Sequence, residues 1–290
     1  MLDFIKYNRL ELREHEGPCT PQGPSFKRAH KYTFDLMGSK LSFRAPKQLH
    51  IFRPGSEQFT PRWFNDELGS LRTGNDPTKT WKSRLLFLRK YAFYGPWFTG
   101  EKASASFAVS VIAPESPPLN VNFLHPRALE TAISGYLTAE YGHNEWDKGE
   151  ARYTGPLEWK SIKNLPVPAA YFLVQNSIDR HRHFYLFIPV SRGRIIIFTF
   201  SYNQHLSGSF EKRDTAINPK ALHELIDQII NSVEFTPSTE LEQDLNEVRK
   251  SCPDLSASKN FPPLKWPATV DETGLNIVEL NEKQRKALVG

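Results

Sequence analysis

The alternation of apolar and polar residues predicts a chain built mainly from β-strands. Residues 31–36 and 41–45 alternate on either side of a Gly38-Ser39 turn, which is typical of a β-hairpin. The same period predicts longer strands over 84–94 and 104–113, although the clustered leucines of the first also fit a helix. Four more strands are expected later in the chain, at 158–162, 169–175, 183–189 and 194–201. The last of these is continuously apolar over four residues, which is typical of a strand covered on both faces.

Apolar residues spaced three and four apart predict the helices. One helix begins at Pro126, a first-turn position where the missing N–H costs nothing, and ends at Gly142. A second helix follows Pro219 and has Asn218 as its N-cap. From Pro237 onward the composition changes, and a short charged helix is followed by several prolines.

Together these elements predict an α+β fold in which helices flank an antiparallel β-sheet. The sheet domain is expected to span 30–236. An N-terminal arm, 1–29, precedes it, and a C-terminal helix with a Pro-rich tail, 237–290, follows it. The stretch 47–75 has no clear period. One face of a short helix there would carry Trp63, Phe64, Leu68 and Leu71.

Composition and charge limit the function classes. Of 290 residues, 39% are apolar, 12% aromatic and 24% charged, which excludes a disordered, collagen-like or coiled-coil chain. The formal net charge of +5 is mild and acids are interleaved with the basic residues, so we expect no direct binding of nucleic acid. The sequence lacks a signal-peptide pattern and its longest apolar runs are strand-sized. We therefore expect a cytoplasmic protein without a membrane span.

Few residues suggest catalysis. Cys19 and Cys252 lie far apart and beside prolines, so free thiols in loops are expected, while one long-range disulfide stays open. Asp147 and Glu150, near Trp146, are the closest approach to a carboxylate pair, and an exposed loop is the favoured interpretation. The sequence has no GxSxG, Walker A or GxGxxG motif. We predict no catalytic residue.

A metal site would start from His181 and His183, which share a face of a strand because they are two residues apart. Nine histidines in the chain produce such a pair by chance, and neither a nearby cysteine nor an HExxH motif accompanies it. We therefore predict neither a metal site nor a cofactor. The histidines that would complete such a site are His143, His205 and His223.

The order of elements in the second half resembles a known fold. Residues 171–174, 183–188 and 195–200 are apolar strands, and after a helix the chain reads Ile-Asn-Ser-Val-Glu-Phe over 230–235. This resembles the PsbP/Mog1-like fold, an antiparallel sheet flanked by helices, whose members include bacterial chaperones of type VI secretion effectors. The chain is also similar to the cytoplasmic immunity proteins paired with such effectors, such as the TsiT immunity protein for a nuclease effector. The resemblance implies a protein partner and carries no catalytic residues.

Three stretches are predicted to contact a protein partner. The segment 91–98 contains a turn, where a strand face cannot bury every aromatic ring, and Trp and Tyr are common binding hot spots. A second aromatic pair follows Arg62, and the basic run 179–183 is interpreted as a solvated hairpin end. The predicted contact residues are Tyr94, Trp97, Phe98, Trp63, Phe64, Arg180 and Arg182.

The leading hypothesis is a non-enzymatic immunity protein that binds and neutralises a cognate type VI secretion toxin, with a nuclease effector as one possible partner. A chaperone of the same fold would instead cradle an apolar segment of an effector on its sheet. An unrecognised hydrolase would show a pocket of converging carboxylates or histidines with perturbed pKa values.

Overall fold

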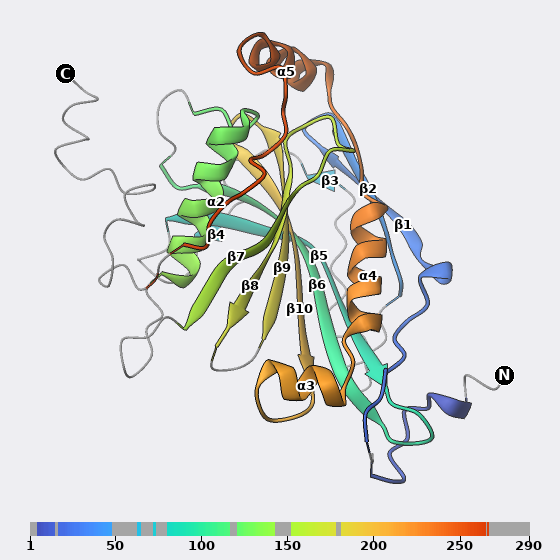
Figure 1. The fold of residues 1–290 in the computed structure, drawn as a ribbon. Coiled ribbons are helices and arrows are strands. Elements are labelled where there is room, and N and C mark those ends of the chain that lie inside the picture. Colours follow the sequence, from blue (N-terminus) through green and yellow to red (C-terminus); the bar gives the residue numbers. More distant parts are fainter. Residues whose placement is uncertain are drawn as a thin grey trace.

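The computed structural model describes residues 5–14, 17–47, 63–64, 72–73, 80–116, 121–142, 152–177, 181–264 and 266. Two β-sheets form the centre of the molecule, and helices cover both faces of the larger one (Figure 1). The fold is therefore α+β with largely antiparallel sheets, as the strand and helix periods predict.

Seven antiparallel strands make the larger sheet, and β10 at its centre is buried on both faces. In spatial order they are β4 (Arg72–Thr73), β5 (Trp81–Tyr94), β6 (Glu101–Pro114), β10 (Arg194–Gln204), β9 (Arg182–Ser191), β8 (Ala170–Asn176) and β7 (Tyr153–Ser161). The segment predicted over 84–94 is thus a strand and not a helix. Its leucines are accommodated because the register shifts at a β-bulge between Leu85 and Phe87.

The smaller sheet packs over one face of the larger one. It contains β11 (Glu234–Thr236), β2 (Ser39–Ala45), β1 (His30–Leu36) and β3 (Trp63–Phe64), in that order. β1 and β2 form the predicted hairpin, whereas β3 pairs with β1 in parallel. The prediction of a helix at Trp63 and Phe64 is therefore wrong, because backbone pairing with the open edge of β1 overrides a weak local period. Leu68 and Leu71 lie outside the described residues.

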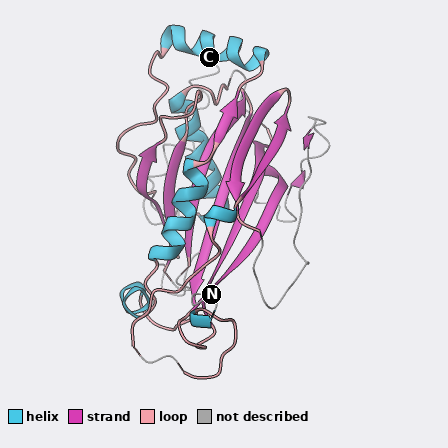
Figure 2. Ribbon diagram, turned by 90° about the vertical axis from the view of Figure 1, so that its right-hand side faces the viewer, coloured by secondary structure: helices cyan, strands magenta, loops and turns pink. Residues whose placement is uncertain are grey.

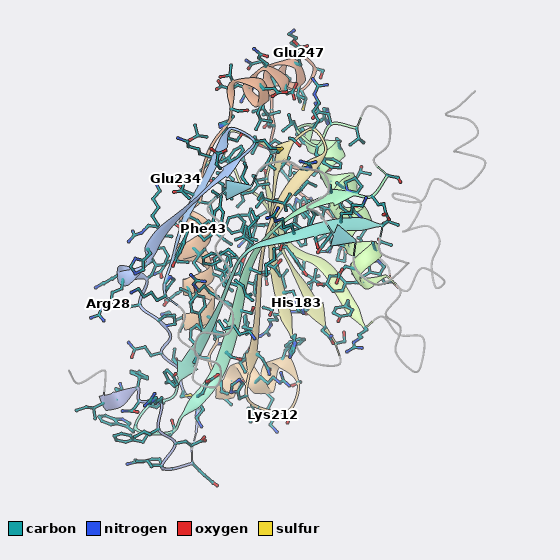
Figure 3. The ribbon with its side chains drawn as sticks, turned by 180° about the vertical axis from the view of Figure 1, so that it is seen from behind. Arg28, Phe43, His183, Lys212, Glu234 and Glu247 are labelled. Atoms are coloured by element: carbon teal, nitrogen blue, oxygen red, sulfur yellow. The ribbon has the colours of Figure 1, made fainter. Side chains whose placement is uncertain are left out.

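Aromatic rings fill the space between the two sheets. Phe43 on β2 is fully buried, and its ring centroid lies 5.2–5.5 Å from those of Phe87, Phe107 and Phe198 on the larger sheet. Figure 3 shows Phe43 between the two sheets. Edge-to-face contacts of this kind add to the burial of apolar area and join the sheets into one core.

Two helices complete that layer, α4 (Lys220–Asn231) and α5 (Thr239–Ser251). The predicted apolar face of α4 is buried against the sheets, and Figure 2 shows this helix lying in front of the strands. The N-cap of α4 is Pro219 and not the predicted Asn218, although the Asn218 side-chain oxygen, one residue earlier, accepts the Lys220 N–H at 2.9 Å. One short helix, α3 (Phe210–Ala216), falls where the sequence predicts only a loop.

The opposite face of the larger sheet is covered by α2 (Pro126–Tyr141), which begins and ends as predicted. Ile133 of α2 packs with Ile195 and Ile197 of β10, while Ile196 and Phe198 of the same strand face the other layer. No helix among the described residues is both long and apolar enough to cross a membrane.

The segment after α5 returns along the edge of the larger sheet. The Leu264 N–H donates to the Gly155 carbonyl on β7 at 2.8 Å, and Phe261 stacks on Trp159 at 4.6 Å between ring centroids. At its far end Trp266 is 5% exposed and donates to Thr138 on α2 at 3.3 Å. Residues 252–264 and 266, called the strap below, cover the edge strand β7.

Candidate functional site

The end of the β5–β6 hairpin carries the N-terminal arm. The Leu12 N–H donates to the Phe98 carbonyl at 2.8 Å, and the Trp97 N–H donates to the Lys6 carbonyl. Further along the arm, Gln22 and Tyr94 exchange two backbone hydrogen bonds of 2.9 Å. Residues 5–14 and 95–100, called the arm–hairpin surface below, are therefore held together by backbone bonds.

Exposed apolar side chains gather on this surface. The described residues include five large hydrophobic side chains that are exposed, and all but Leu85 belong to the arm–hairpin surface. Such clustering is unusual on a monomer, where single exposed apolar residues are normally scattered. The four are Ile5, Leu10, Leu12 and Trp97, with exposed fractions of 44%, 48%, 72% and 48%.

The turn that presents Trp97 has an unusual backbone. Trp97 and Phe98 both have positive φ, 54° and 64°, a region that bulky side chains rarely adopt and that costs about 1–2 kcal/mol for each residue. Gly100 beside them has φ 70°, which glycine adopts without strain. Two aromatic residues in strained positions on an exposed turn fit a binding role better than a packing role.

The structure separates the aromatic contact residues that the sequence predicts. Trp97 is half exposed and Phe98 is half-buried, whereas Tyr94 is 8% exposed and lies under the arm. Trp63 and Phe64 pair with the far end of β1, next to Leu36, away from the hairpin end (Figure 1). The two aromatic stretches therefore do not form one surface.

Of the two predicted arginines, Arg180 lies outside the described residues and Arg182 is buried. The Arg182 guanidinium makes a two-point ion pair with Asp214 on α3, at 2.7 and 2.9 Å, and also donates to the Tyr202 hydroxyl at 3.0 Å. A guanidinium held this way joins α3 to the sheet. It is not offered to a partner, because releasing it would leave a buried charge uncompensated.

A network of polar side chains surrounds this ion pair. The Tyr202 hydroxyl is 2.8 Å from His223 Nε2, and Gln204 donates to Asp214 at 2.8 Å. Burial opposes ionisation of Asp214, but the hydrogen bonds from Arg182 and Gln204 outweigh it and hold the pKa of that carboxyl below its usual range. Burial lowers the pKa of His223, so this histidine is a neutral member of the network.

The histidines considered for a metal site are spread over the fold. The rings of His181 and His183 lie 6.3 Å apart, and burial lowers the pKa of His183 to about 4. His223 is committed to the network around Arg182. Across the described part of the chain, no group of three or more histidine, cysteine or acidic side chains has metal-site geometry. His143 lies outside that part.

One constellation resembles a hydrolase triad in composition. The His205 ring nitrogen Nε2 is 3.1 Å from the Ser104 hydroxyl and 3.8 Å from a Glu101 carboxylate oxygen. Both groups approach the same nitrogen, whereas a triad places the hydroxyl and the carboxylate on opposite nitrogens of the ring. This geometry therefore does not activate Ser104 as a nucleophile.

The other residues weighed for catalysis give no site. Both cysteines are free, and burial raises the pKa of the Cys19 thiol, which disfavours the reactive thiolate. The Cys252 thiol donates to the Asp254 carbonyl at 3.2 Å in the strap. The loop predicted to carry the carboxylates, 146–150, lies outside the described residues.

Comparison with known proteins identifies no family. No family model and no curated protein matches this chain. Solved structures with some likeness include LpqN, involved in cell envelope biogenesis of Mycobacterium tuberculosis, at 9% identity and a TM-score of 0.28, covering 58% of this chain and 90% of LpqN. The type VI secretion immunity protein TplEi from Pseudomonas aeruginosa has 11% identity, covers 82% of each chain and has a TM-score of 0.25. A chain of the Tle4–Tli4 complex has 10% identity and a TM-score of 0.25, covering 77% and 98%.

These TM-scores are too low to establish a shared fold, so the function has to be argued from this chain's own residues. The resemblance to the PsbP/Mog1-like fold and to TsiT stays a prediction. The sequence predicts an N-terminal arm, 1–29, but not that its apolar residues Ile5, Leu10 and Leu12, which stand among polar neighbours, are exposed beside the hairpin end. Apolar residues among polar neighbours are the one sequence signal by which the part of this surface formed by residues 5–14 could have been found.

Proposed function

We propose that this chain is a non-enzymatic binding protein that neutralises a cognate type VI secretion toxin in the bacterial cytoplasm. The observation that carries the proposal is the gathering of Ile5, Leu10, Leu12 and Trp97 on the arm–hairpin surface. A partner that covers them removes apolar area from water, and a stable complex of this kind buries on the order of 1,600 Å².

The rest of the fold gives the arm–hairpin surface a rigid support. Both faces of the larger sheet are covered, one by β1, β2 and α4 and the other by α2, so a sheet that cradles an effector segment is not favoured. The order of the sheet strands and the final helix resembles that of type VI immunity proteins and chaperones, which supports a toxin as partner. No observation favours a nuclease over another toxin.

Co-expression with the toxin encoded beside its gene tests the proposal. We expect the wild-type chain to protect cells and to bind the purified toxin with a Kd in the nanomolar range, about −12 kcal/mol. Leu12→Ser removes an apolar contact that is exposed in the free protein, so we expect at least a tenfold loss of affinity without loss of folding. Leu85→Ser is the matched control, because Leu85 is exposed but lies outside the arm–hairpin surface.

Two results contradict the proposal. One is a toxin that binds no tighter than micromolar, or that binds Leu12→Ser and Leu85→Ser as tightly as the wild type. The other is turnover of a substrate by the purified chain that a single side-chain replacement abolishes.

A further inference from the structure

Two neighbouring grooves share residues 22–25 of the N-terminal arm in their linings, and together they are called the trough below. The first, of about 820 Å³, lies between this segment and residues 7–10. The second, of about 730 Å³, reaches α4. Both are lined by Tyr7 and by residues 22–25, so the trough runs from the hairpin end toward α4.

The side chains that line the trough are strongly basic. Among the described residues that line it, five carry a positive charge and only Glu224 carries a negative one. Glu224 is itself 3.8 Å from Lys220, a further cation that lies outside the trough. The five cations are Lys6, Arg9, Lys27, Arg28 and Arg44.

Several of these charges form no ion pair with a described residue. Arg9, Lys27 and Arg28 are exposed, and no described carboxylate forms an ion pair with any of them. Figure 3 shows Arg28 on the outer side of the molecule, away from the sheets. Unpaired like charges repel one another, so an occupant of opposite charge is stabilised there.

The middle of the trough is held rigidly. Gln22 exchanges two backbone hydrogen bonds with Tyr94, and Gly23 lies so close to the buried Phe93 ring that a Cβ atom would be 2.2 Å from it. A groove fixed in this way binds an extended segment without first paying to order itself.

We propose that this trough binds an acidic, extended segment of the partner protein. The inference rests on the proposed function, because it gives the chemistry of the toxin segment that lies beside the arm–hairpin surface. A peptide is favoured over single-stranded nucleic acid because Leu10, which lines the trough, and the apolar side chains of the arm–hairpin surface beside it are exposed and suit a protein partner.

Fluorescence anisotropy with defined probes tests the trough without the toxin. The probes are a labelled Glu-rich peptide of about twelve residues with two Phe, the same peptide with Lys in place of Glu, and an oligodeoxythymidylate of similar length. We expect the Glu-rich peptide to bind at least tenfold tighter than either other probe, and its binding to weaken steadily between low and high salt because the contacts are ionic.

Charge reversal locates the binding site. Arg9→Glu with Arg28→Glu is expected to weaken binding of the Glu-rich peptide at least tenfold. Lys40→Glu with Lys259→Glu makes the same change in net charge at exposed positions outside the trough, and we expect it to change Kd less than twofold. Circular dichroism shows whether each variant is folded.

The outcomes separate this inference from the proposed function. Equal effects of the two charge reversals, no binding of the Glu-rich peptide, or tighter binding of the oligonucleotide would overturn the trough inference. If the toxin of the co-expression assay binds the Arg9→Glu, Arg28→Glu protein as tightly as the wild type, the trough inference is also wrong while the proposed function stands.

Discussion

At the scale of single residues, Trp97 shows how a side chain can be costly for the fold and still be retained. Its positive φ is strained, and half of its ring remains in water. Glycine would occupy the same backbone conformation without strain. A residue that is both strained and half exposed contributes little to the stability of the fold. We therefore expect Trp97 to contribute to the affinity for a partner instead.

Replacing Trp97 by glycine and by alanine separates these two roles. Both changes remove the ring, but only Trp97→Gly relieves the backbone strain, so we expect Trp97→Gly to be more stable than Trp97→Ala by about 0.5–1 kcal/mol. Both variants should lose at least tenfold in affinity for the toxin. Urea denaturation and calorimetry measure the two effects, and full affinity in either variant would contradict a binding role.

Glu101 is a second residue whose environment works against the fold. Its side chain is 7% exposed, one carboxylate oxygen has no hydrogen-bond partner among the described residues, and burial raises the pKa to about 7. Because the folded pKa lies above the unfolded one, this group favours folding only while it is protonated. The contribution is complete below about pH 4.5 and is lost as the pH rises through 7.

The expected size of this loss is on the order of 3 kcal/mol, from the difference between the two pKa values. Glu101→Gln cannot ionise, so the variant should match the wild type near pH 5 and exceed its stability by about 2–3 kcal/mol near pH 8. Chemical denaturation at the two pH values measures this. Parallel pH dependence in the two proteins would show that Glu101 is not the group responsible.

At the scale of elements, the strap covers the open edge of β7, as a further strand of the sheet would. An edge strand presents unpaired backbone groups to other chains. The strap pairs one of them through Leu264, and Trp159 on β7 donates to the Ser258 carbonyl at 2.8 Å. The Ser258 N–H in turn donates to Glu130, which is buried on α2. The strap therefore links α2 to the edge of the sheet.

Ending the chain at Cys252 tests this role. The truncation exposes Trp159 and leaves Glu130 without its strap partner, so we expect a loss of several kcal/mol in stability and stronger binding of a hydrophobic dye. A chain that ends at Trp266 keeps the strap and is the control. Equal melting temperatures for the two truncated chains would show that the strap contributes nothing to stability.

At the scale of the whole molecule, the central sheet separates two apolar clusters. One lies between the two sheets and contains Phe43, and the other lies under α2 and contains Ile133. β10 contributes alternate side chains to both, so the clusters share a backbone but no side chain. The arm–hairpin surface extends from the same sheet through β5 and β6, which gives it a stiff support.

Substitutions in the two clusters should therefore act independently. We expect Phe43→Leu to cost about 1–2 kcal/mol and Ile133→Val about 0.5–1.5 kcal/mol, because each removes buried apolar volume. The double variant should lose the sum to within about 0.5 kcal/mol, since the two sites share no partners. A larger departure, measured by urea denaturation, would show that the layers are coupled through the sheet.

The sequence by itself determined the elements whose periods are strong. Alternation located the β1–β2 hairpin and the strands of the larger sheet other than β4, and three- and four-residue spacing located α2, α4 and α5. These elements can be predicted because the polarity of each residue indicates which side of its own strand or helix is buried. The exposure of Trp97 also followed from the sequence, since a turn cannot bury consecutive rings, whereas its contact with a partner stays a prediction.

Only the tertiary structure decided how distant segments meet. It paired β3 with β1, buried Arg182 against Asp214, placed the strap along β7 and brought the arm onto the hairpin end. These contacts join residues far apart in the chain. They are stabilised by backbone hydrogen bonds and by opposite charges, and the pattern of apolar residues within one segment does not predict either. The arm–hairpin surface and the basic trough, on which the proposed function and its partner depend, are therefore properties of the fold.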